Sequence, residues 1–268
     1  MALPRQKPES CSTICTRSIA EKSGSGLVLA AERVGADPGH LAKCVLSPQI
    51  GRDIEHFYDQ VVEQFTHRLW SDQNRHDGDR FRLFSTVRNA VGGVRVLYPG
   101  SFVDVAASAV YPEVTYVDID NRTPRFFRDT SGVTDIIESM GGPREHVVEF
   151  LHADYRDELP LENESFDLLV SLYAGFVSEH CTRHLRVGGT LLVGPSHGDA
   201  AMASIDRRYQ LTGVVVSRSG SYNVSANQID TYLVPKKPVD ITPELLHERG
   251  RGIAYTNSPF AYLFQRIA

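Results

Sequence analysis

Long hydrophobic segments are absent from this sequence, and cysteine is scarce. No stretch approaches the roughly 18 consecutive apolar residues that a membrane-spanning helix needs, and the first residues lack the apolar core of a signal peptide. We therefore expect a protein that does not span a membrane and that stays in the cytoplasm. Four cysteines among 268 residues are too few for a disulfide framework, so we expect free thiols.

An excess of positive charge is also missing. The formal net charge is −5 and the isoelectric point is about 6.1, so no strong basic field is present to attract the phosphates of nucleic acid. Hydrophobic residues make up 41% and charged residues 23%, which is ordinary for a globular protein. This composition favours a small-molecule substrate over nucleic acid or a membrane, in a monomer or a homodimer.

Glycine is scarce where an α/β protein usually holds a nucleotide. Residues 94–108, VRVLYPGSFVDVAAS, predict a buried strand that runs into a turn and then a helix, but the turn has only Gly100. Pro99 lacks a backbone N–H donor, and the side chain of Phe102 prevents the close approach that glycine permits. A pyrophosphate needs such an approach, so a dinucleotide is a poor candidate ligand.

The N-terminal third predicts a tail followed by a helical cap. Residues 1–25 are polar and predict a disordered tail. Residues 26–92 form the expected cap, with two short helices over 26–47 and an amphipathic helix over 53–70. The apolar stripe of that helix indicates either a lid over a site or a dimer interface; it consists of Phe57, Val61, Phe65 and Leu69.

From residue 94 strands and helices alternate, which predicts a parallel sheet with right-handed crossovers. The expected strands span 94–98, 114–118, 147–151, 166–171 and 190–194. The expected helices lie near 102–109, 124–140 and 176–186. Residues 209–235 predict an antiparallel strand pair that closes the edge of the sheet. We assign 93–240 to this domain and 241–268 to an extension, helical at first and then loop-like, that packs on it.

The residues that follow the strands are candidates for a site, because open parallel sheets bind ligands beyond the carboxyl ends of their strands. Asp118 ends the second strand, 18 residues after Gly100, a spacing that suits an acid that accepts the hydroxyl hydrogens of a ribose. The alternative is that Asp118 is only the polar end of a strand. Later strand ends offer Asp154 and Tyr155, then Ser171, Leu172 and Tyr173, and finally Ser196, His197 and Asp199.

A longer pattern runs from residue 159 to residue 193. It combines Leu-Pro, an acidic turn, Ser-Phe-Asp, an apolar strand, a helix and Arg-x-Leu-x-x-Gly-Gly before a further strand. Its motif residues are Leu159, Pro160, Ser165, Phe166, Asp167, Arg183, Leu185, Gly188 and Gly189. With YVDID at 116–120 and ADYRDELP at 153–160, the chain resembles class I S-adenosylmethionine-dependent methyltransferases over about residues 90–235.

The resemblance implies an α/β, Rossmann-like three-layer sandwich. Its mostly parallel sheet would have seven strands, the last of them antiparallel, beside the N-terminal helical cap. The implied cofactor is S-adenosylmethionine, and the implied product is S-adenosylhomocysteine.

The resemblance also implies which residues hold the cofactor. Gly100 and its neighbours Tyr98 and Ser101 would approach its amino-acid end. Asp118 would hold the ribose, and Ile119 would pack on the adenine. The remaining implied contacts are Asp154 on the adenine amino group with Tyr155 beside it, and Ser171, Leu172 and Tyr173 along the methionine part and the substrate.

The opening motif departs from the family pattern. The family usually has an acidic residue and then three glycines at alternate positions, where this chain has Tyr98, Gly100, Phe102 and Asp104. S-adenosylmethionine carries no phosphates and needs a glycine cradle less strictly than a dinucleotide does. Asp104 or Ser101 is then a candidate to bind the ammonium group. Either the turn still binds the cofactor or the site has been lost.

Two side chains are candidates for catalysis, although methyl transfer needs mainly alignment and a base is optional. Tyr173 is the best placed, and the alternative is that it only forms a wall of the pocket. His197 is a candidate proton acceptor, and the alternative is a loop histidine that faces water. His180 and His184 have metal-ligand spacing, but the pair lacks a third ligand, so we expect no metal site.

The sequence therefore favours an enzyme, an S-adenosylmethionine-dependent methyltransferase that acts on an oxygen, nitrogen or sulfur atom of a small molecule. One alternative is a binding or regulatory protein that has kept the fold and lost transfer. Another is an enzyme of different chemistry on the same fold, such as aminopropyl transfer.

Overall fold

The computed structural model describes residues 18–23, 26–31, 62–75, 78–143 and 145–268. The chain divides into two compact units, Met1–Val61 and Val62–Ala268, and each is described by itself. No helix among the described residues has both the length and the apolar character to cross a membrane.

The first unit contains an antiparallel hairpin of β1 (Ser18–Ser23) and β2 (Gly26–Ala31). The expected helix from residue 26 is therefore wrong over β2. A short apolar run such as residues 26–31 does not distinguish a strand from a helix by its periodicity alone. The rest of the expected first helices and the start of the amphipathic helix, including Phe57 and Val61, lie outside the described residues.

The second unit begins with helical residues 62–73 and α2 (Asp79–Val91), which confirm the helical character of the described end of the cap. Leu69 and Trp70 are buried in the first helix, and Leu83, Phe84 and Val87 are fully buried in α2. The spacing of these apolar residues gives each helix one face that packs on the sheet.

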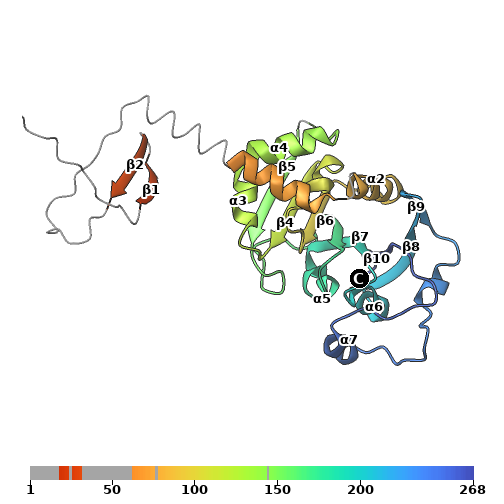
Figure 1. Cartoon of the computed structure of the whole chain (residues 1–268). Coiled ribbons are helices and arrows are strands. Elements are labelled where there is room, and N and C mark those ends of the chain that lie inside the picture. Colours follow the sequence, from red (N-terminus) through yellow and green to blue (C-terminus); the bar gives the residue numbers. More distant parts are fainter. Residues whose placement is uncertain (1–17, 24–25, 32–61, 76–77, 144) are drawn as a thin grey trace, which may run out of the picture. The chain divides into compact units, whose positions relative to one another are not determined.

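An eight-stranded sheet forms the centre of the second unit (Figure 1). Its strands are β3 (Arg95–Pro99), β4 (Glu113–Asp118), β5 (Val147–His152), β6 (Phe166–Ser171), β7 (Leu185–Val193), β8 (Tyr209–Arg218), β9 (Ser221–Ser225) and β10 (Ala261–Arg266). The order across the sheet is β5-β4-β3-β6-β7-β10-β8-β9. Strands β3 to β7 are parallel to one another, and β10 lies antiparallel between β7 and β8. This order confirms the mostly parallel, Rossmann-like sheet with an antiparallel last strand.

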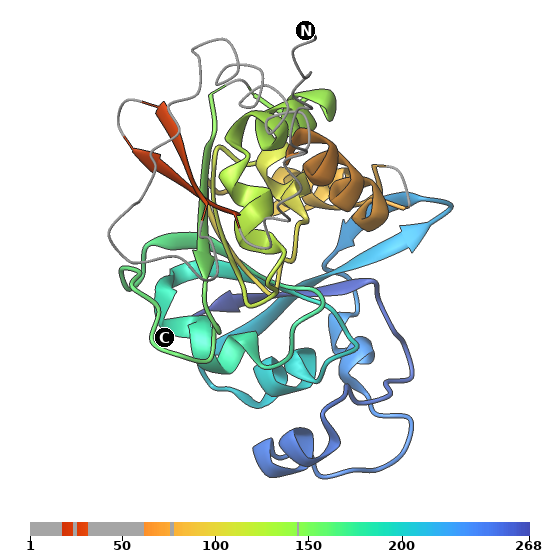
Figure 2. The same ribbon diagram turned by 60° about the vertical axis from the view of Figure 1, so that its left-hand side comes forward.

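The eighth strand is an addition to the seven that were expected. β9 pairs antiparallel with β8 at the edge of the sheet, which confirms the expected strand pair as far as Ser225. Its expected continuation to residue 235 is wrong, because residues 229–233 form a 3₁₀ helix. Figure 2 shows this hairpin beside α2, and the hydroxyl of Tyr222 on β9 donates to both carboxylate oxygens of Asp79 on α2, at 2.8 and 2.9 Å. The added strand therefore ties the far edge of the sheet to the start of α2.

The C-terminal segment differs most from the expected structure. The expected loop-like tail is wrong, because residues 261–266 form β10, a strand inside the sheet. Tyr262, Leu263 and Phe264 are each at most 1% exposed, since helices or neighbouring segments cover both faces of the strand. A strand that is buried on both faces has no alternation of polar and apolar residues to reveal it.

Two of the expected helices differ from the observed ones. The helix expected near 102–109 is a short 3₁₀ helix, η1 (Val105–Ala109). The helix expected over 124–140 divides into α3 (Thr123–Arg128) and α4 (Thr130–Ser139). The division falls at Asp129, whose side chain accepts a hydrogen bond from the backbone N–H of Gly132 at 3.0 Å and so caps a new helix.

The third expected helix, over 176–186, is shorter than the pattern indicated. It consists of α5 (Val177–Cys181) and the 3₁₀ turn η2 (Thr182–His184), and β7 begins at Leu185 rather than at residue 190. The Gly188-Gly189 pair lies inside β7, where the pairing with β6 jumps from Phe166–Leu185 to Leu168–Thr190. The two glycines therefore lie in an irregular part of β7, whereas the sequence pattern placed the start of the strand after them.

Helices cover both faces of the sheet. Val96 and Tyr98 of β3 belong to a core that includes residues of α2, η1 and α4, whereas Leu97 belongs to a second core with α5 and α6 (Asp199–Ile205). The connection after β9 contains η3 (Ile229–Leu233) and α7 (Pro243–Arg249), and α7 begins after the side-chain cap at Thr242. The sheet is therefore the middle layer of a three-layer sandwich.

The Ser-Phe-Asp motif has a structural role at the amino-terminal edge of the sheet. The carboxylate of Asp167 accepts hydrogen bonds from the backbone N–H groups of Val94 and Arg95, at 2.7 and 3.0 Å, and from Nε of Arg186 at 2.6 Å. Partial burial raises the pKa of Asp167, but these donors outweigh it and hold the pKa below its usual value. One side chain thus joins the starts of β3, β6 and β7.

The position of β10 yields a stability test. We expect Leu263→Ala to lower the free energy of unfolding by about 2–5 kcal/mol, because it leaves a cavity beside a fully buried strand. The control is Ile267→Ala, one residue beyond β10 and 49% exposed, which should change it by less than about 0.5 kcal/mol. Urea denaturation followed by circular dichroism measures both. Equal effects would contradict the placement of β10 inside the sheet.

Candidate functional site

The carboxyl ends of the parallel strands meet at one edge of the sheet. The chain leaves β3 toward β4 on one side, and β6 lies on the other side of β3, so the strand order reverses between β3 and β6. Open α/β sheets bind their ligands at such a switch point, beyond the carboxyl ends of the strands. The turn after β3 and the loop after β6 are therefore the first places to inspect.

Gly100 brings these two segments into contact. Its φ of +64° lies in the left-handed region, and its N–H donates to the carbonyl oxygen of Val117 at 2.8 Å. A Cβ at this position would lie 2.5 Å from Cβ of Ala174 in the loop after β6. Glycine is therefore required here both by the backbone conformation and by the close packing of the two loops.

An open pocket of about 490 Å³ lies at this junction. Three of the expected site residues contribute to its wall, namely Gly100, Ser101 and Tyr173. Phe102 forms another part of the wall. The rest comes from the end of the helix over residues 62–73 and the two residues after it, and from the start of α2; the residues are Asp72, Gln73, Asn74, Arg75, Asp79 and Arg80. The described end of the cap thus borders the pocket, as a lid would.

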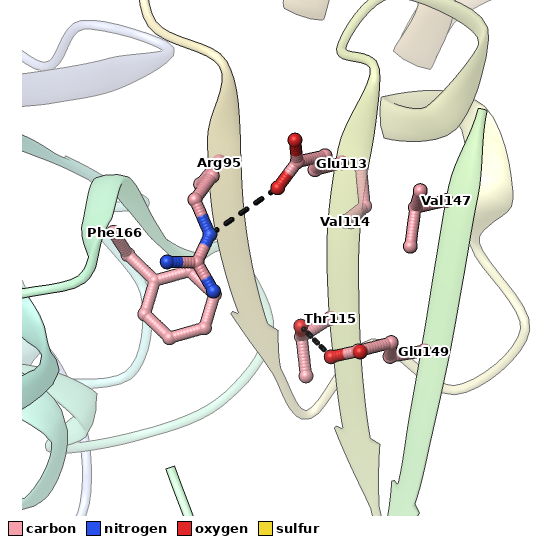
Figure 3. Close-up of a pocket in the computed structure, with 7 residues that line it drawn as sticks. All are labelled: Arg95, Glu113, Val114, Thr115, Val147, Glu149 and Phe166. Atoms are coloured by element: carbon pink, nitrogen blue, oxygen red, sulfur yellow. Dashed lines mark hydrogen bonds and ion pairs between the residues drawn. The ribbon is translucent and has the colours of Figure 1, made fainter. Parts of the chain in front are cut away.

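A second hollow lies at the opposite, amino-terminal edge of the sheet, and it is far smaller, at about 30 Å³ (Figure 3). Its polar groups are paired with one another. Nε of Arg95 lies 3.3 Å from a carboxylate oxygen of Glu113, and the hydroxyl of Thr115 donates to Glu149 at 3.0 Å. This hollow therefore offers little space and few free groups to a ligand.

Tyr98 and Asp104 lie in the core beneath the turn rather than on the pocket wall. Both are 1% exposed, and the hydroxyl of Tyr98 donates to Oδ2 of Asp104 at 3.0 Å. Oδ1 of Asp104 accepts the N–H of Ala106 at 3.2 Å and caps η1. Burial raises the pKa of Asp104, against the opposing effects of Arg80, Ala106 and Tyr98. The two side chains anchor the turn from below.

Asp118 lies at the end of β4 and holds the same turn from the side. Its Oδ2 accepts the N–H of Phe102 at 2.7 Å, and its Oδ1 accepts the N–H of Asp120 at 2.8 Å. Phe102 adopts a φ of +50°, which is unusual for a residue other than glycine. The carboxylate thus stabilises a backbone conformation that the family pattern assigns to glycine.

Charged residues line the same edge on the β4 side. Ile119 is 60% exposed, and Arg122 forms a two-pronged pair with Asp120, at 2.9 and 2.7 Å. The guanidinium carbon of Arg122 lies 4.6 Å from the ring centroid of Phe102. Arg122 and Phe102 therefore cover part of the edge where the adenosine of the implied cofactor would lie.

Asp154 and Tyr155 follow β5 and are also engaged. The carboxylate of Asp154 pairs with Arg156 two residues on, at 2.5 to 3.0 Å, and these hydrogen bonds lower its pKa. The hydroxyl of Tyr155 donates to the carbonyl oxygen of Gly175 at 2.9 Å. Tyr155 therefore supports the loop after β6 from the β5 side.

A buried carboxylate fixes the start of that loop. Asp199, the first residue of α6, accepts hydrogen bonds from the hydroxyl of Ser171 at 2.5 Å and from the hydroxyl and backbone N–H of Ser178. Burial raises the pKa of Asp199, and the surrounding donors act in the opposite direction. Ser171 and Leu172 are both buried, so they support the site from within the fold.

The two candidate catalytic side chains lie near each other at the pocket. Tyr173 is 58% exposed, and its ring packs edge-on against His197 with the centroids 6.4 Å apart. Nδ1 of His197 lies 2.7 Å from the hydroxyl oxygen of Ser196. Tyr173 is part of the pocket wall, whereas His197 contacts Tyr173 but does not line the pocket.

His180 and His184 are not brought together with a third ligand. His184 is buried, its Nδ1 lies 3.1 Å from the carbonyl oxygen of Glu162, and burial lowers its pKa. Among the described residues, the group with the spacing of a metal site is instead Glu63, His67 and Asp135, whose ligand atoms lie within 4.8 Å of one another and are exposed.

Arg80 is the residue that sequence reasoning missed. Arg80 is the second residue of α2. In the sequence it is one of several arginines of that helix and nothing marks it as buried, yet its side chain is only 14% exposed. Nε lies 3.6 Å from Oδ2 of Asp104, and the guanidinium carbon lies 4.6 Å from the ring centroid of Tyr173. No sequence signal distinguishes it from Arg82, because the tertiary packing of α2 on the turn places it.

Comparisons with known proteins give partial matches only. No family model matches the sequence, and no curated protein matches it. Similar solved structures include an arsenic(III) S-adenosylmethionine methyltransferase from Chlamydomonas reinhardtii, with 22% identity over 39% of each chain and a TM-score of 0.32. The chain therefore spans well under two thirds of the length of that algal protein.

Two further structures are bound to cofactor or product. The O-methyltransferase TomG from Streptomyces achromogenes, in complex with S-adenosylmethionine, is 10% identical over 67% of this chain and 96% of its own, with a TM-score of 0.37. The N-methyltransferase NodS from Bradyrhizobium japonicum, in complex with S-adenosylhomocysteine, is 15% identical over 59% and 92%, with a TM-score of 0.39. Because these similarities are low, we assign the fold class from the strand order of this chain.

The Asp199 network yields a test of how the site is supported. We expect Asp199→Ala to lower the free energy of unfolding by about 3 kcal/mol, because it leaves the buried hydroxyls of Ser171 and Ser178 without their acceptor. The exposed Asp157→Ala is the control, with a change under about 0.5 kcal/mol. Urea denaturation measures both, and a loss as small as that of the control would show that Asp199 does not fix the loop.

Proposed function

We propose that this protein is an S-adenosylmethionine-dependent methyltransferase that acts on a small-molecule acceptor through an oxygen, nitrogen or sulfur atom. The observation that carries the proposal is the pocket at the switch point between β3 and β6, in a sheet whose antiparallel last strand inserts between β7 and β8. A mostly parallel sheet with an antiparallel last strand is what the motif resemblance implies, and the pocket lies where such sheets bind ligands.

The residues at the pocket suit the proposed cofactor. Each oxygen of Asp118 accepts one backbone N–H, and an ionised carboxylate accepts about four hydrogen bonds, so lone pairs remain for the two ribose hydroxyls. Gly100 and Ser101 would border the amino-acid end. Because Ser101 lines the pocket and Asp104 does not, Ser101 is the better of the two candidates near the ammonium group.

Methyl transfer in this pocket would be a direct displacement. A lone pair of the acceptor forms a bond to the methyl carbon while the bond to the sulfonium sulfur breaks, and S-adenosylhomocysteine leaves as a neutral thioether. The contribution of the protein would be to align the two reactants and to exclude water. Tyr173 would orient the acceptor, and His197, in contact with Tyr173, would accept a proton where the acceptor must lose one.

A small acceptor is supported by the size of the pocket and by the charge of the chain. A volume of about 490 Å³ lies within the range of small-molecule sites, and a net charge of −5 disfavours nucleic acid. We place the protein in the cytoplasm as a monomer or a homodimer.

A second candidate function is a binding or regulatory protein that has lost transfer. Phe102 favours it, because its ring and the stacked guanidinium of Arg122 cover part of the edge on the β4 side. A protein of this kind would keep the fold and the pocket but would not seat the adenosine.

Calorimetric titration with S-adenosylmethionine and S-adenosylhomocysteine tests the proposal. We expect binding of both ligands to the wild-type protein, and Asp118→Ala should weaken it about 10- to 100-fold because hydrogen bonds to a charged group are lost. Asp120→Ala is the matched control, two residues on, where the carboxylate pairs with Arg122 instead of the turn.

Each outcome of this titration is informative. Unchanged affinity in Asp118→Ala would remove Asp118 from the site. Absence of binding to the folded wild-type protein would contradict the proposed function, and restored binding in Phe102→Gly would then favour the second candidate.

A further inference from the structure

Arg80 lines the candidate pocket, and one donor of its guanidinium, Nη1, is unused among the described residues. Its side chain is 14% exposed and borders the pocket between the turn after β3 and the loop after β6. The rings of Tyr173 and Phe260 flank it, with centroids 4.6 and 6.0 Å from the guanidinium carbon. Nη1 is buried and has no hydrogen-bond partner among the described residues.

The neighbouring carboxylates do not satisfy this donor. Asp104 faces Nε at 3.6 Å, which is too long for a hydrogen bond, and its oxygens already accept from Tyr98 and Ala106. Asp79 accepts from the hydroxyl of Tyr222 on β9 and pairs with Arg82. A buried cationic donor without an acceptor is unfavourable, so a ligand with an acceptor group would relieve a cost that the folded protein already carries.

We propose that Arg80 is a carboxylate receptor, and that the ligand bound in this pocket places a carboxylate group on its guanidinium. The planar fork of a guanidinium matches a carboxylate in geometry. Asp104 offsets one positive charge nearby, so the site suits a monoanion better than a dianion such as phosphate. Phe102 and Tyr173 on the same wall suit an apolar or aromatic body beside the carboxylate.

Two sources of the carboxylate are compatible with this geometry, and naming them rests on the proposed function. One is the amino-acid end of S-adenosylmethionine, since Gly100 and Ser101 share the wall with Arg80. The other is an acceptor molecule that is itself a carboxylic acid, held against Tyr173. The receptor role of Arg80 is the same in both cases.

The first arm of the test compares S-adenosylmethionine with decarboxylated S-adenosylmethionine by calorimetry. If the cofactor supplies the carboxylate, the wild-type protein should prefer the intact cofactor about 10- to 100-fold, and Arg80→Gln should reduce that preference below about threefold. Arg88→Gln, which changes an arginine of the same helix that does not line the pocket, should keep the wild-type preference.

The second arm compares benzoate with benzamide, with and without saturating S-adenosylhomocysteine. Binding is followed through the fluorescence of Trp70, the only tryptophan of the chain, which lies two residues before the pocket-lining Asp72. If the acceptor supplies the carboxylate, benzoate should bind the wild type at least about tenfold more tightly than benzamide does. Arg80→Gln should abolish that difference, and Arg88→Gln should preserve it.

Arg80→Lys keeps the inference testable if Arg80→Gln does not fold. Lysine retains the charge beside Asp104 but lacks the planar fork, so we expect about a 5- to 10-fold loss of the carboxylate preference with a circular dichroism spectrum like that of the wild type. A preference that is lost in either arm supports the receptor and identifies its source. Folded variants that equal the wild type in both arms would overturn it.

The two proposals fail in different ways. If neither S-adenosylmethionine nor S-adenosylhomocysteine binds the wild-type protein, the proposed function fails, while the benzoate arm without cofactor still tests Arg80. If both bind normally and Arg80→Gln or Arg80→Lys leaves every preference unchanged, the receptor fails while the proposed function stands.

Discussion

A hydrogen bond of 2.7 Å from the backbone N–H of Phe102 to the carboxylate of Asp118 holds the turn on which the candidate site depends. The turn carries a phenylalanine in a left-handed conformation, which is strained for any residue with a side chain. Asp118 stabilises it from the end of β4, and Asp104 anchors it from the core below. Gly100 can then pack directly against Ala174, and the pocket opens between the two loops.

The loops around this pocket are supported by polar contacts made inside the protein. Asp199 fixes the start of the loop after β6, and Tyr155 holds Gly175 from the β5 side. Such satisfied buried networks rigidify their surroundings. Arg80 is the exception on the pocket wall, because its Nη1 is buried without a partner among the residues described. A rigid wall with one unused cationic donor is suited to recognise a ligand that brings the missing acceptor.

The sequence predicted the parallel strands well, because each is a short apolar run that ends in polar or turn residues. It did not predict β10, whose burial on both faces leaves no alternation, nor the break at Asp129, which depends on one side-chain cap. Gly100, Ser101 and Tyr173, which line the pocket, could be named as candidates because they lie just after strands. The burial of Asp104 and the inward position of Arg80 depend on how α2 and η1 pack on the sheet, which a single sequence does not encode in any local pattern.

Hydrogen–deuterium exchange with and without S-adenosylhomocysteine tests the central claim most directly, which is that the ligand lies at the β3–β6 edge. We expect slower exchange of the backbone amides at 100–104 and 172–176, and no change at 113–115 and 147–149 on the opposite edge of the sheet. Protection confined to the opposite edge, or no protection of the turn after β3 at saturating ligand, would contradict the account.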